Sequence, residues 1–440
     1  MAQTVQKQID PNKKYSFPTN ISIVRYDSKI IVIAVDTGNW IVLENEKQLE
    51  FFNLLKENTL EKSLALFSGE QGDAVQTVIQ LEARQFERQN VTSTESKKVM
   101  MYLTNGCNMR CPHCYMYAGC KKEDELRTDE IISFLSEIKK TGINKITFSG
   151  GEVCTRDDFS EIINRTYELG FEIEVLTNGT LWTDEMIESL SPKINKVQIS
   201  VDGYSEEENA RIRGKGNFEK SLSTVDKFIK HGVKTRIAIT PWYDENLKNK
   251  IDDYANFANN LIEKYKGKPF EVNFSGEMIK GREINLEKEE NEKRTEIIEQ
   301  ITAKTVPISR RIVFIERHKK FEILDNCSFG NLNVSYTGDI FACSRISEMK
   351  PFANLRKDGI AKVLKISDKA KKISNIDNLE PCNKCELKYI CGGGCRLIHF
   401  KQIAQISDFD SEKVPPRICT QKEKESFYDL MIKSNKDIFQ

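Results

Sequence analysis

The stretch TNGCNMRCPHC, Thr104–Cys114, decides the fold, and it follows a strand-like run at Lys98–Leu103. It places three cysteines, Cys107, Cys111 and Cys114, at a C-x3-C-x2-C spacing. Three thiolates can hold a four-iron cluster and leave one iron open to a chelating molecule. A zinc site or three buried thiols is the alternative, although zinc usually takes four protein ligands from paired C-x2-C motifs.

Beyond the cysteines, short apolar runs alternate with helical patterns. Such alternation predicts βα units around a parallel sheet. The expected strands are Lys98–Leu103, Ile146–Phe148, Ile173–Leu176, Val197–Val201, Arg236–Ile239 and Val272–Phe274. Thr128 is expected to cap the first helix, in which Ile131 and Leu135 recur at helical spacing. Six strands predict an α/β fold built on an open, partial (β/α)6 TIM-like barrel rather than a closed barrel.

Small polar residues and carboxylates follow the ends of these strands, where the ligand sites of α/β folds gather. The second strand runs into Ser149-Gly150-Gly151-Glu152, whose glycines allow a close backbone approach and whose carboxylate can meet an ammonium group. Taken alone, this sequence would also suit an ordinary turn. The candidate residues at this rim are Gly150, Gly151, Glu152, Asn178, Ser200 and Asp202.

The triad and the strand ends together resemble the radical S-adenosylmethionine (SAM) superfamily. The resemblance implies that Cys107, Cys111 and Cys114 bind a 4Fe-4S cluster whose open iron takes the amino and carboxylate groups of SAM. It also implies that the Gly-Gly-Glu segment meets the amino group and that residues at the third and fourth strand ends, Asn178, Ser200 and Asp202, surround the sugar. Arg213 would pair with the carboxylate and His113 would contact the adenine. Arg213 could instead be a solvated helix charge, and His113 an ordinary loop residue.

Most of the other cysteines lie in the last third of the chain. Cys382, Cys385, Cys391 and Cys395 form C-x2-C-x5-C-x3-C, preceded by Cys327 and Cys343 and followed by Cys419. This order resembles the SPASM extension of radical SAM enzymes, which carries two auxiliary iron-sulfur clusters. The resemblance assigns Cys382, Cys385, Cys391 and Cys419 to an outer cluster, and Cys327, Cys343 and Cys395 to an inner one. The alternative, a zinc ribbon, would leave Cys327, Cys343 and Cys419 without a role.

Seven cysteines are one too few to close two such clusters, so the inner cluster should have an iron without a cysteine. That position could take a substrate thiolate, a water or a noncysteine protein ligand, or the cluster could be smaller. Cys120 and Cys154 fit neither pattern and are interpreted as packing or adventitious thiols. Twelve cysteines without a recognisable secretory leader favour metal or redox use over disulfides, and a cytoplasmic location.

The first 95 residues carry a different pattern, in which three strands precede three helices. The expected strands are Ile21–Val24, Ile30–Ala34 and Trp40–Leu43, and the expected helices are Lys47–Lys56, Glu61–Phe67 and Asp73–Arg88. This order resembles the winged-helix-like leader-recognition element of peptide-modifying radical enzymes. The resemblance implies a precursor leader that adds as a strand to an exposed sheet edge. A structural cap without a partner is the alternative.

We therefore predict three domains: a recognition domain at 1–95, a radical SAM partial barrel at 96–310 and a cysteine-rich SPASM domain at 311–440. With 66 basic and 66 acidic residues and no long basic arm, neither nucleic acid nor a membrane is expected as a partner. The charged stretch Glu283–Lys304 is expected to form an exposed helix.

The resemblance implies an enzyme that cleaves SAM to a 5′-deoxyadenosyl radical and abstracts hydrogen from a ribosomally made precursor peptide. The expected product is a crosslink, first of all a cysteine thioether. Carbon-carbon or carbon-oxygen crosslinking, epimerisation and anaerobic sulfatase-type maturation remain open. An iron-sulfur electron carrier or a zinc scaffold is the nonenzymatic alternative. The expected partners are a precursor with a leader and a cytosolic electron donor such as flavodoxin or ferredoxin. The sequence does not identify a catalytic acid or base.

Overall fold

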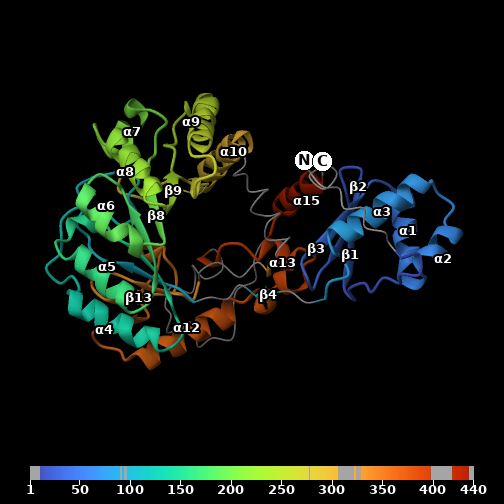
Figure 1. Ribbon diagram of the computed structural model, residues 1–440, viewed down its shortest axis with the longest axis horizontal. Coiled ribbons are helices and arrows are strands. Elements are labelled where there is room, and N and C mark those ends of the chain that lie inside the picture. The colour runs from blue at the N-terminus through green and yellow to red at the C-terminus, as the bar shows by residue number, and fades with distance from the viewer. Residues whose placement is uncertain are drawn as a thin grey trace.

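The computed structural model describes residues 10–89, 92–93, 97–276, 278–305, 322–323, 329–397 and 419–435 (Figure 1). Cys327, predicted as an inner-cluster ligand, lies outside these residues. The described part contains a large mixed sheet flanked by helices and a separate three-stranded sheet near the N-terminus. Among the described helices, none is long and apolar enough to cross a bilayer.

Six parallel strands form the larger part of the main sheet, which confirms the predicted α/β architecture. They are β5 (Val99–Tyr102), β6 (Lys145–Ser149), β7 (Glu172–Thr177), β8 (Lys196–Ser200), β9 (Lys234–Ile239) and β10 (Phe270–Phe274). The helices between and after them are α4 (Thr128–Lys139), α5 (Phe159–Glu168), α6 (Asp184–Leu190), α7 (Glu206–Arg213), α8 (Phe218–Lys230), α9 (Ile251–Lys264) and α10 (Lys288–Lys304). The strand order begins at β10 and runs to β5 without closing, as expected of a partial barrel.

The main sheet continues beyond β5 into three strands that the sequence analysis did not predict. These are β12 (Leu332–Val334), β13 (Asp339–Phe341) and β14 (Ala353–Asn354), and they make the sheet nine-stranded. β12 is parallel to β5, whereas β13 and β14 are antiparallel additions. Strands of two or three residues are too short to show the alternation by which strands are recognised in a sequence. The C-terminal segment is therefore joined to the barrel through the strand that leads into the cysteine triad.

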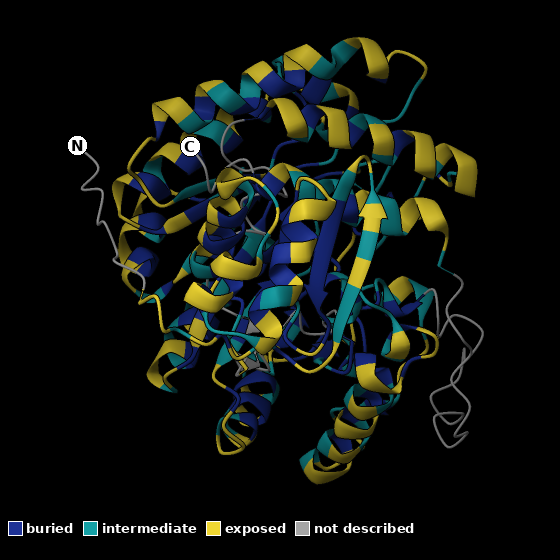
Figure 2. Cartoon of the chain, turned by 90° about the vertical axis from the view of Figure 1, so that its right-hand side faces the viewer, coloured by how far each residue is buried: buried dark blue, intermediate teal, exposed yellow. Residues whose placement is uncertain are grey.

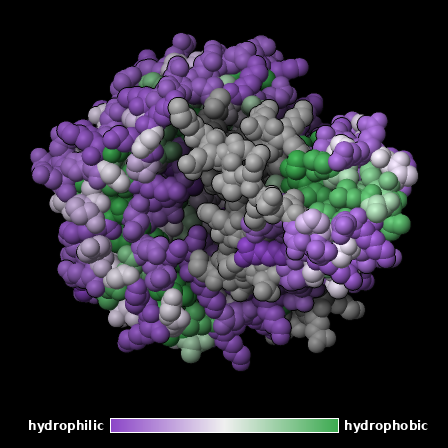
Figure 3. Space-filling model, turned by 45° about the vertical axis from the view of Figure 1, so that its right-hand side comes forward, coloured by the Kyte–Doolittle hydropathy of each residue, from purple (hydrophilic) through white to green (hydrophobic). Residues whose placement is uncertain are grey.

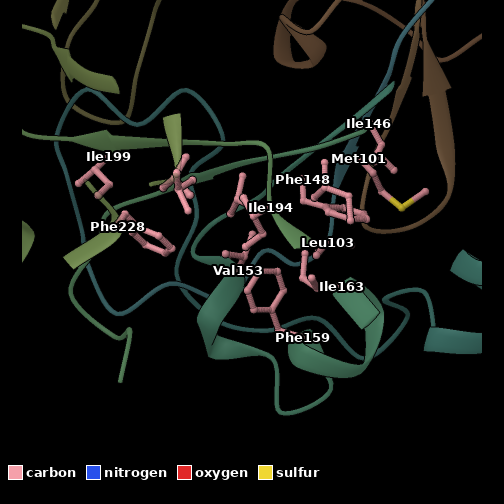
Figure 4. Packing of buried hydrophobic residues seen from close by; sticks show 14 of the residues in the cluster. Met101, Leu103, Ile146, Phe148, Val153, Phe159, Ile163, Ile194, Ile199 and Phe228 are labelled. Atoms are coloured by element: carbon pink, nitrogen blue, oxygen red, sulfur yellow. The ribbon is translucent and has the colours of Figure 1, made fainter. Parts of the chain in front are cut away.

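The core beneath the triad is a continuous apolar layer between the strands and their helices (Figure 4). Strand residues such as Met101 and Phe148 are fully buried and meet helix residues such as Phe159 and Ile163. Figure 2 shows the matching pattern in the described part of the chain, with dark blue residues inside and yellow residues on the outer faces of helices. Burial of side chains of this size typically stabilises by about 1.5–3 kcal/mol each, so this layer fixes the strand ends that carry the site.

Two details of the predicted helices were wrong. The cap of α4 is Arg127 rather than Thr128, and the carboxylate of Glu130 accepts a hydrogen bond from the Arg127 backbone N–H at 2.9 Å. The predicted helix at Glu283–Lys304 begins only at Lys288, and it is not a wholly exposed helix. It buries Arg294, whose guanidinium donates to the carbonyl oxygens of Pro241, Ser275 and Gly276.

The N-terminal segment has the predicted order of three strands and three helices. The strands β1 (Ile21–Tyr26), β2 (Lys29–Ala34) and β3 (Asn39–Leu43) form an antiparallel sheet, and the helices are α1 (Glu46–Glu57), α2 (Leu60–Leu66) and α3 (Gln71–Ala83). The third helix ends five residues before the predicted Arg88, and Gln85 has a positive φ of 46°. The order of elements is thus confirmed, while its relation to a winged helix stays a prediction.

Both faces of the N-terminal sheet are covered. One face packs on α1 and α3 through Val32 and Ile41, and the other packs on C-terminal residues through Ile31 and Trp40. The C-terminal contribution comes from the short helix α13 (Lys388–Cys391) and its neighbour Leu387, and from α15 (Gln421–Asn435), which Figure 1 shows beside the sheet. The domain boundaries at residues 95 and 310 stay a prediction. The apolar contact nevertheless joins the N-terminal sheet to α13 and α15 of the C-terminal segment.

Candidate functional site

The three cysteines of the triad lie on the loop that follows β5. The base of this loop is closed by two backbone hydrogen bonds, from Cys107 N–H to Gly119 O at 2.9 Å and from Gly119 N–H to Asn105 O at 2.8 Å. Burial raises the pKa of the Cys107 thiol to about 11, with further contributions from Glu152, Cys111 and Cys114. The three sulfurs therefore share one electrostatic environment, in which a cation or a metal cluster would stabilise the thiolates.

Glu125 holds the start of the cysteine loop and was not predicted as a site residue. Its side chain is buried, and Oε1 accepts hydrogen bonds from the Asn105 backbone N–H at 2.8 Å, the Thr104 hydroxyl at 3.0 Å and the Lys122 N–H at 3.0 Å. In the sequence it belongs to the charged run Lys121–Glu125, which has the composition of a solvated segment. No sequence signal separates Glu125 from its charged neighbours.

A second support comes from the segment after β10. Arg282 donates to the carbonyl oxygens of Cys111, at 3.2 Å, and of Ala118. The backbone N–H of Glu283 donates to Pro112 O at 2.8 Å. A Cβ at Gly281 would lie 2.5 Å from the carbonyl carbon of His113, so only glycine allows this approach. The last parallel strand thus fixes the loop that follows the first one.

The two glycines after β6 pack against the cysteine loop. Gly151 N–H donates to Thr104 O at 2.8 Å, and a Cβ at Gly151 would lie 2.2 Å from Gly106 O. A Cβ at Gly150 would lie 2.6 Å from Thr104 O, and its φ is +148°. The close approach that these glycines allow is therefore between two backbone segments of the site. Their contact with SAM stays a prediction.

Glu152 is fully buried and joins the ends of β6 and β7. Its carboxylate accepts hydrogen bonds from the Thr177 hydroxyl at 2.6 Å, the Asn178 N–H at 2.7 Å and the Cys154 N–H at 3.3 Å. Burial raises the pKa of Glu152 against the opposing effect of these hydrogen bonds. The Cys154 thiol is a fourth hydrogen-bond partner of this carboxylate, which has about four acceptor positions, so an ammonium group would have to replace one of these donors.

Asn178 and Asn108 connect this strand end to the triad. The Asn178 side-chain amide donates to Asn108 Oδ1 at 2.8 Å, and Asn108 directly follows Cys107. The Asn178 side-chain oxygen accepts hydrogen bonds from the N–H and hydroxyl of Thr180. Asn178 therefore lies at the cysteine loop, as the position of its strand predicted.

Asp202, Arg213 and His113 meet at the end of β8. Asp202 Oδ2 accepts from Arg213 Nε at 2.6 Å and lies 3.3 Å from His113 Nε2, while Oδ1 accepts from the Thr240 N–H at 2.8 Å. The bond to Asp202 uses Nε of Arg213, so the planar end of the guanidinium can face a second anion. Burial lowers the pKa of Arg213, but Asp202, Cys111 and Cys107 together outweigh burial, so the Arg213 pKa is raised.

His113 has the features of a ligand contact. Burial has the largest influence on the His113 pKa and lowers it, whereas the charge of Asp202 raises it. The neutral imidazole therefore donates from Nε2 toward Asp202 and keeps Nδ1 as an acceptor. Within the described residues, Nδ1 is buried and has no hydrogen-bond partner. Ser200, the last residue of β8, is half-buried at the same rim.

The C-terminal cysteines lie in one region of the structure, and their division into two ligand sets stays a prediction. Four of them line one cavity of about 540 Å³: Cys382, Cys385, Cys391 and Cys419. Cys343 and Cys395 belong to an apolar cluster around Phe329 and Leu379 that also includes Cys382, with Arg345 Nη1 at 4.0 Å from the Cys395 sulfur. The predicted outer set therefore shares a cavity, and the described part of the predicted inner set lies outside its lining.

No three His, Cys, Asp or Glu side chains in the described ranges are gathered around a point where one metal ion could be held. The thiolates of an iron-sulfur cluster bind different irons, so they surround a larger body than a single ion. Four soft thiolates in a cavity of this size suit such a cluster, although Glu299, Glu386 and Glu423 line the cavity as well. Cys120, by contrast, is exposed, and Cys154 lies beside Glu152.

This arrangement defines an α/β protein with a three-thiolate site at the rim of its parallel strands and a second cysteine-rich region. Comparison with known families agrees. Residues 101–258 match the radical SAM superfamily, and residues 326–386 match the SPASM iron-sulfur cluster-binding domain. The chain therefore carries a radical SAM domain and a SPASM domain. These two domains imply SAM, a 4Fe-4S cluster and auxiliary clusters as cofactors.

Individual relatives match different extents of the chain. A segment of 155 residues is 32% identical to the sporulation killing factor maturation protein SkfB of Bacillus subtilis (strain 168), which is 35% of this chain and 37% of that protein. A segment of 320 residues is 26% identical to the AdoMet-dependent heme synthase of Methanosarcina barkeri (strain Fusaro / DSM 804), covering 67% of this chain and 89% of that protein.

Among solved structures, native anSMEcpe with bound AdoMet aligns with a TM-score of 0.56 and 17% identity, over 78% of this chain and 99% of that one. A likeness at this identity establishes the shared fold. The chain spans only about a third of the length of SkfB, so its own reaction and substrate are matters for proposal.

Proposed function

We propose that this chain is a radical SAM maturase that installs a crosslink, first of all a cysteine thioether, in a ribosomally made precursor peptide. The observation that carries the proposal is the three-thiolate loop facing the cluster of Asp202, Arg213 and His113. When bound there, the cluster and SAM supply a 5′-deoxyadenosyl radical that abstracts hydrogen from the substrate.

The residues around the triad have defined tasks in this proposal. Cys107, Cys111 and Cys114 hold the cluster. The planar end of Arg213 binds the SAM carboxylate as a two-point partner. The strand-end residues receive the rest of the molecule: Gly150, Gly151 and Glu152 the amino group, Asn178, Ser200 and Asp202 the sugar, and His113 Nδ1 the adenine.

The C-terminal cysteines hold two auxiliary clusters in this proposal. Cys382, Cys385, Cys391 and Cys419 hold the outer one, as their shared cavity supports. Cys343 and Cys395, with Cys327, hold the inner one. With only three cysteines, the inner cluster offers one iron to a substrate thiolate, which would be desolvated and oriented before the carbon radical arrives. This is the reason for preferring a thioether over the other crosslinks.

The precursor is proposed to dock on the N-terminal sheet at β1 rather than at β3. The outer edge of β3 is already occupied by side-chain amides. Gln80, which is 1% exposed, accepts from the Val42 N–H at 2.8 Å and donates back to the Val42 carbonyl oxygen, as an added strand would. The next outward N–H, that of Glu44, donates to Gln48 at 2.8 Å. A peptide would have to displace both amides from β3.

The edge of β1 is open to a peptide. No strand in the described part of the chain pairs with its outer side. The Val35 N–H donates to Asn20 O, so Asn20 and Val35 form a hydrogen-bonded pair between β1 and β2. Because such pairs alternate along an antiparallel ladder, the backbone N–H and C=O groups of Ile21, Ile23 and Arg25 point away from β2. Ile23 is also 37% exposed. Figure 3 shows apolar atoms gathered at the right of the view, the side on which the N-terminal part of the chain lies. Main-chain bonds to β1 and an apolar contact at Ile23 suit an extended leader.

The docking site can be tested on the full chain with the short peptide encoded beside its gene, measured by fluorescence anisotropy. Ile23→Pro removes an outward N–H without breaking the ladder to β2 and should weaken binding. Gln80→Leu frees the β3 edge and should leave binding unchanged. Tighter binding to Gln80→Leu, together with no effect of Ile23→Pro, would place the peptide on β3 instead.

The reaction can be tested by anaerobic reconstitution with iron and sulfide. With SAM and dithionite, the protein should form 5′-deoxyadenosine, and with the peptide it should yield a product lighter by two hydrogen atoms per crosslink. Zinc-loaded protein without 5′-deoxyadenosine would refute the proposal. A cysteine-free precursor would favour carbon-carbon or carbon-oxygen crosslinking, or epimerisation. In the cell, flavodoxin or ferredoxin is proposed to replace dithionite.

A second candidate follows from the heme synthase match, which spans more of this chain than the SkfB match does. The chain is therefore also similar to a protein whose name points to a substrate other than a peptide. The N-terminal sheet decides between the two, because a tetrapyrrole offers no backbone to a strand edge. Turnover of an iron porphyrin in place of the peptide would favour this second candidate.

A further inference from the structure

A buried and a half-buried tyrosine connect the cysteine triad to the inner cysteine site. Tyr102 ends β5 and is fully buried, and Tyr115 directly follows Cys114. Their hydroxyl oxygens lie 3.2 Å apart, and the Tyr102 hydroxyl donates to Ser344 O at 2.5 Å. Ser344 directly follows Cys343. A continuous chain of hydrogen bonds thus runs from the residue beside Cys114 to the residue beside Cys343.

The donor and acceptor of each hydrogen bond in this series follow from the number of hydroxyl protons. A carbonyl oxygen can only accept, so the single hydroxyl proton of Tyr102 points to Ser344. Tyr115 must then donate to Tyr102 for the short contact between their oxygens to be a hydrogen bond. Both O–H dipoles are therefore oriented from the triad toward the Cys343 loop. Tyr115 also lies within electrostatic range of both Cys114 and Cys343.

We propose that Tyr102 and Tyr115 are positioning residues that lock the inner cysteine site against the triad loop and favour the reduced form of the cluster held there. This rests on the proposed function for the presence of that cluster. Reduction adds negative charge at Cys343, and hydrogen-bond dipoles whose positive ends point toward that charge raise a cluster's potential. Arg345, at 4.0 Å from the Cys395 sulfur, acts in the same sense from another side.

The direction of the chain makes the two phenols unequal. Tyr102→Phe removes the donor to Ser344 and the acceptor for Tyr115, so both links are lost. Tyr115→Phe removes only the first link and leaves the bond to Ser344. Both substitutions keep the aromatic ring, so packing is retained. Tyr265→Phe is the matched control, because Tyr265 is also buried and donates to Asp226 at 2.7 Å in a contact that involves none of the cysteines.

The test is a redox titration of the reconstituted protein followed by electron paramagnetic resonance, with Cys343→Ala identifying the inner-cluster signal. Tyr102→Phe should shift the inner potential to a more negative value, Tyr115→Phe should shift it less, and Tyr265→Phe should not shift it. Crosslinked peptide should fall roughly ten- to hundredfold in Tyr102→Phe, as for other residues that support metal ligands. Thermal melts compare the folding of all variants.

An inner potential that is the same in wild type, Tyr102→Phe and Tyr115→Phe would overturn the inference. So would an equal shift in Tyr265→Phe, or a wild-type protein that takes up no iron at Cys343. The potential is measured whether or not SAM is cleaved. A wild type that holds the clusters but forms no 5′-deoxyadenosine would therefore count against the proposed function and not against the tyrosine chain.

Discussion

The triad loop and the C-terminal cysteine region carry similar ligands on very different supports. The triad loop begins at a central strand, is closed by backbone hydrogen bonds to Gly119, and is held from outside by Glu125 and Arg282. The C-terminal cysteines lie on the short 3₁₀ helix Cys382–Lys384, the four-residue helix α13 and the turns around them. The protein backbone fixes the geometry of the triad loop, whereas the C-terminal cysteine region has little regular secondary structure to fix its geometry.

This difference indicates how each site depends on metal. A loop framed by backbone bonds keeps its shape without a ligand, so its cluster is added to an existing site. The cavity of about 540 Å³ takes Cys382, Cys385 and Cys391 from a 3₁₀ helix, a turn and a four-residue helix, although α13 and α15 also pack on the N-terminal sheet. Where ligands come from such segments, metal-binding free energy becomes folding free energy. The triad therefore serves reactivity, and the outer cysteines also serve stability.

The largest expected effect is the loss of SAM cleavage in Cys111→Ala. Removal of one of three thiolates should reduce 5′-deoxyadenosine to the background level, while circular dichroism and the melting temperature stay near wild type, because the loop is held by the backbone. Cys120→Ala is the control, since Cys120 is exposed and outside both cysteine sets. If Cys111→Ala unfolded, the triad would also be needed for folding, and the proposed difference between the triad loop and the C-terminal cysteine region would be wrong.

Removal of iron should produce the second largest effect, and it should be confined to one region. After anaerobic chelation, amide exchange should accelerate strongly in residues 376–397 and much less in β5 to β9, since a structural metal can supply on the order of 10 kcal/mol of folding free energy. Exchange measured by mass spectrometry on holo and apo protein reports both regions at once. An equal acceleration everywhere, or none, would contradict the proposed difference in support.

The sequence predicted the parallel strands and the triad loop better than the C-terminal region, for a physical reason. The strands β5 to β10 have four to six residues each, and in β6 to β9 buried apolar residues alternate with polar ones, so all six were visible in the sequence. The spacing of Cys107, Cys111 and Cys114 is local. β12 to β14 have two or three residues each, and their place beside β5 is set by tertiary contact alone. Arg282 and Glu125 act through distant backbone carbonyls and N–H groups, which leave no mark on their own neighbours in the sequence.

The Gly150–Gly151 pair shows a further limit. The sequence indicated that a backbone comes close to something at this point, and the structure shows that the partner is the Thr104–Gly106 backbone. A glycine signals a need for space without naming what fills it. In the same way, an acidic residue in a charged run signals solvent, and only the fold distinguishes buried Glu125 from exposed Glu123.

A smaller effect is expected when the support of the triad is weakened and its ligands are kept. Glu125→Ala leaves the N–H groups of Asn105 and Lys122 without their acceptor, so it should destabilise the protein by roughly 1–3 kcal/mol and slow SAM cleavage. Glu125→Gln keeps an acceptor and should cost less. Urea unfolding and 5′-deoxyadenosine formation are compared with Glu123→Ala, an exposed neighbour. If Glu123→Ala lowered stability and SAM cleavage as much as Glu125→Ala, the charged segment Lys121–Glu125 would act through its charge and not through the hydrogen bonds of Glu125.

The smallest expected effect is a pH-dependent contact between the barrel and the C-terminal strands. Glu130 of α4 accepts from Arg356 at 2.8 and 3.2 Å, and these bonds, with that from Arg127 N–H, lower the Glu130 pKa from 4.5 to about 2. A lowered folded pKa stabilises fully above the ordinary value of 4.5 and loses this contribution as pH falls through about 2. Solvent screens the pair, so its contribution is about 1 kcal/mol.

Glu130→Gln should therefore lower the urea midpoint near neutral pH, and the difference from wild type should shrink as the pH falls below the ordinary pKa of glutamate. Asp129→Asn is the matched control on the same helix, because Asp129 is 85% exposed and bonds to Arg165 on the surface. A difference that stays constant with pH would mean that the charge of Glu130 does not contribute to stability. A difference that disappears with acid would establish that the C-terminal strands are held to the barrel electrostatically as well as by β12, independently of either cysteine site.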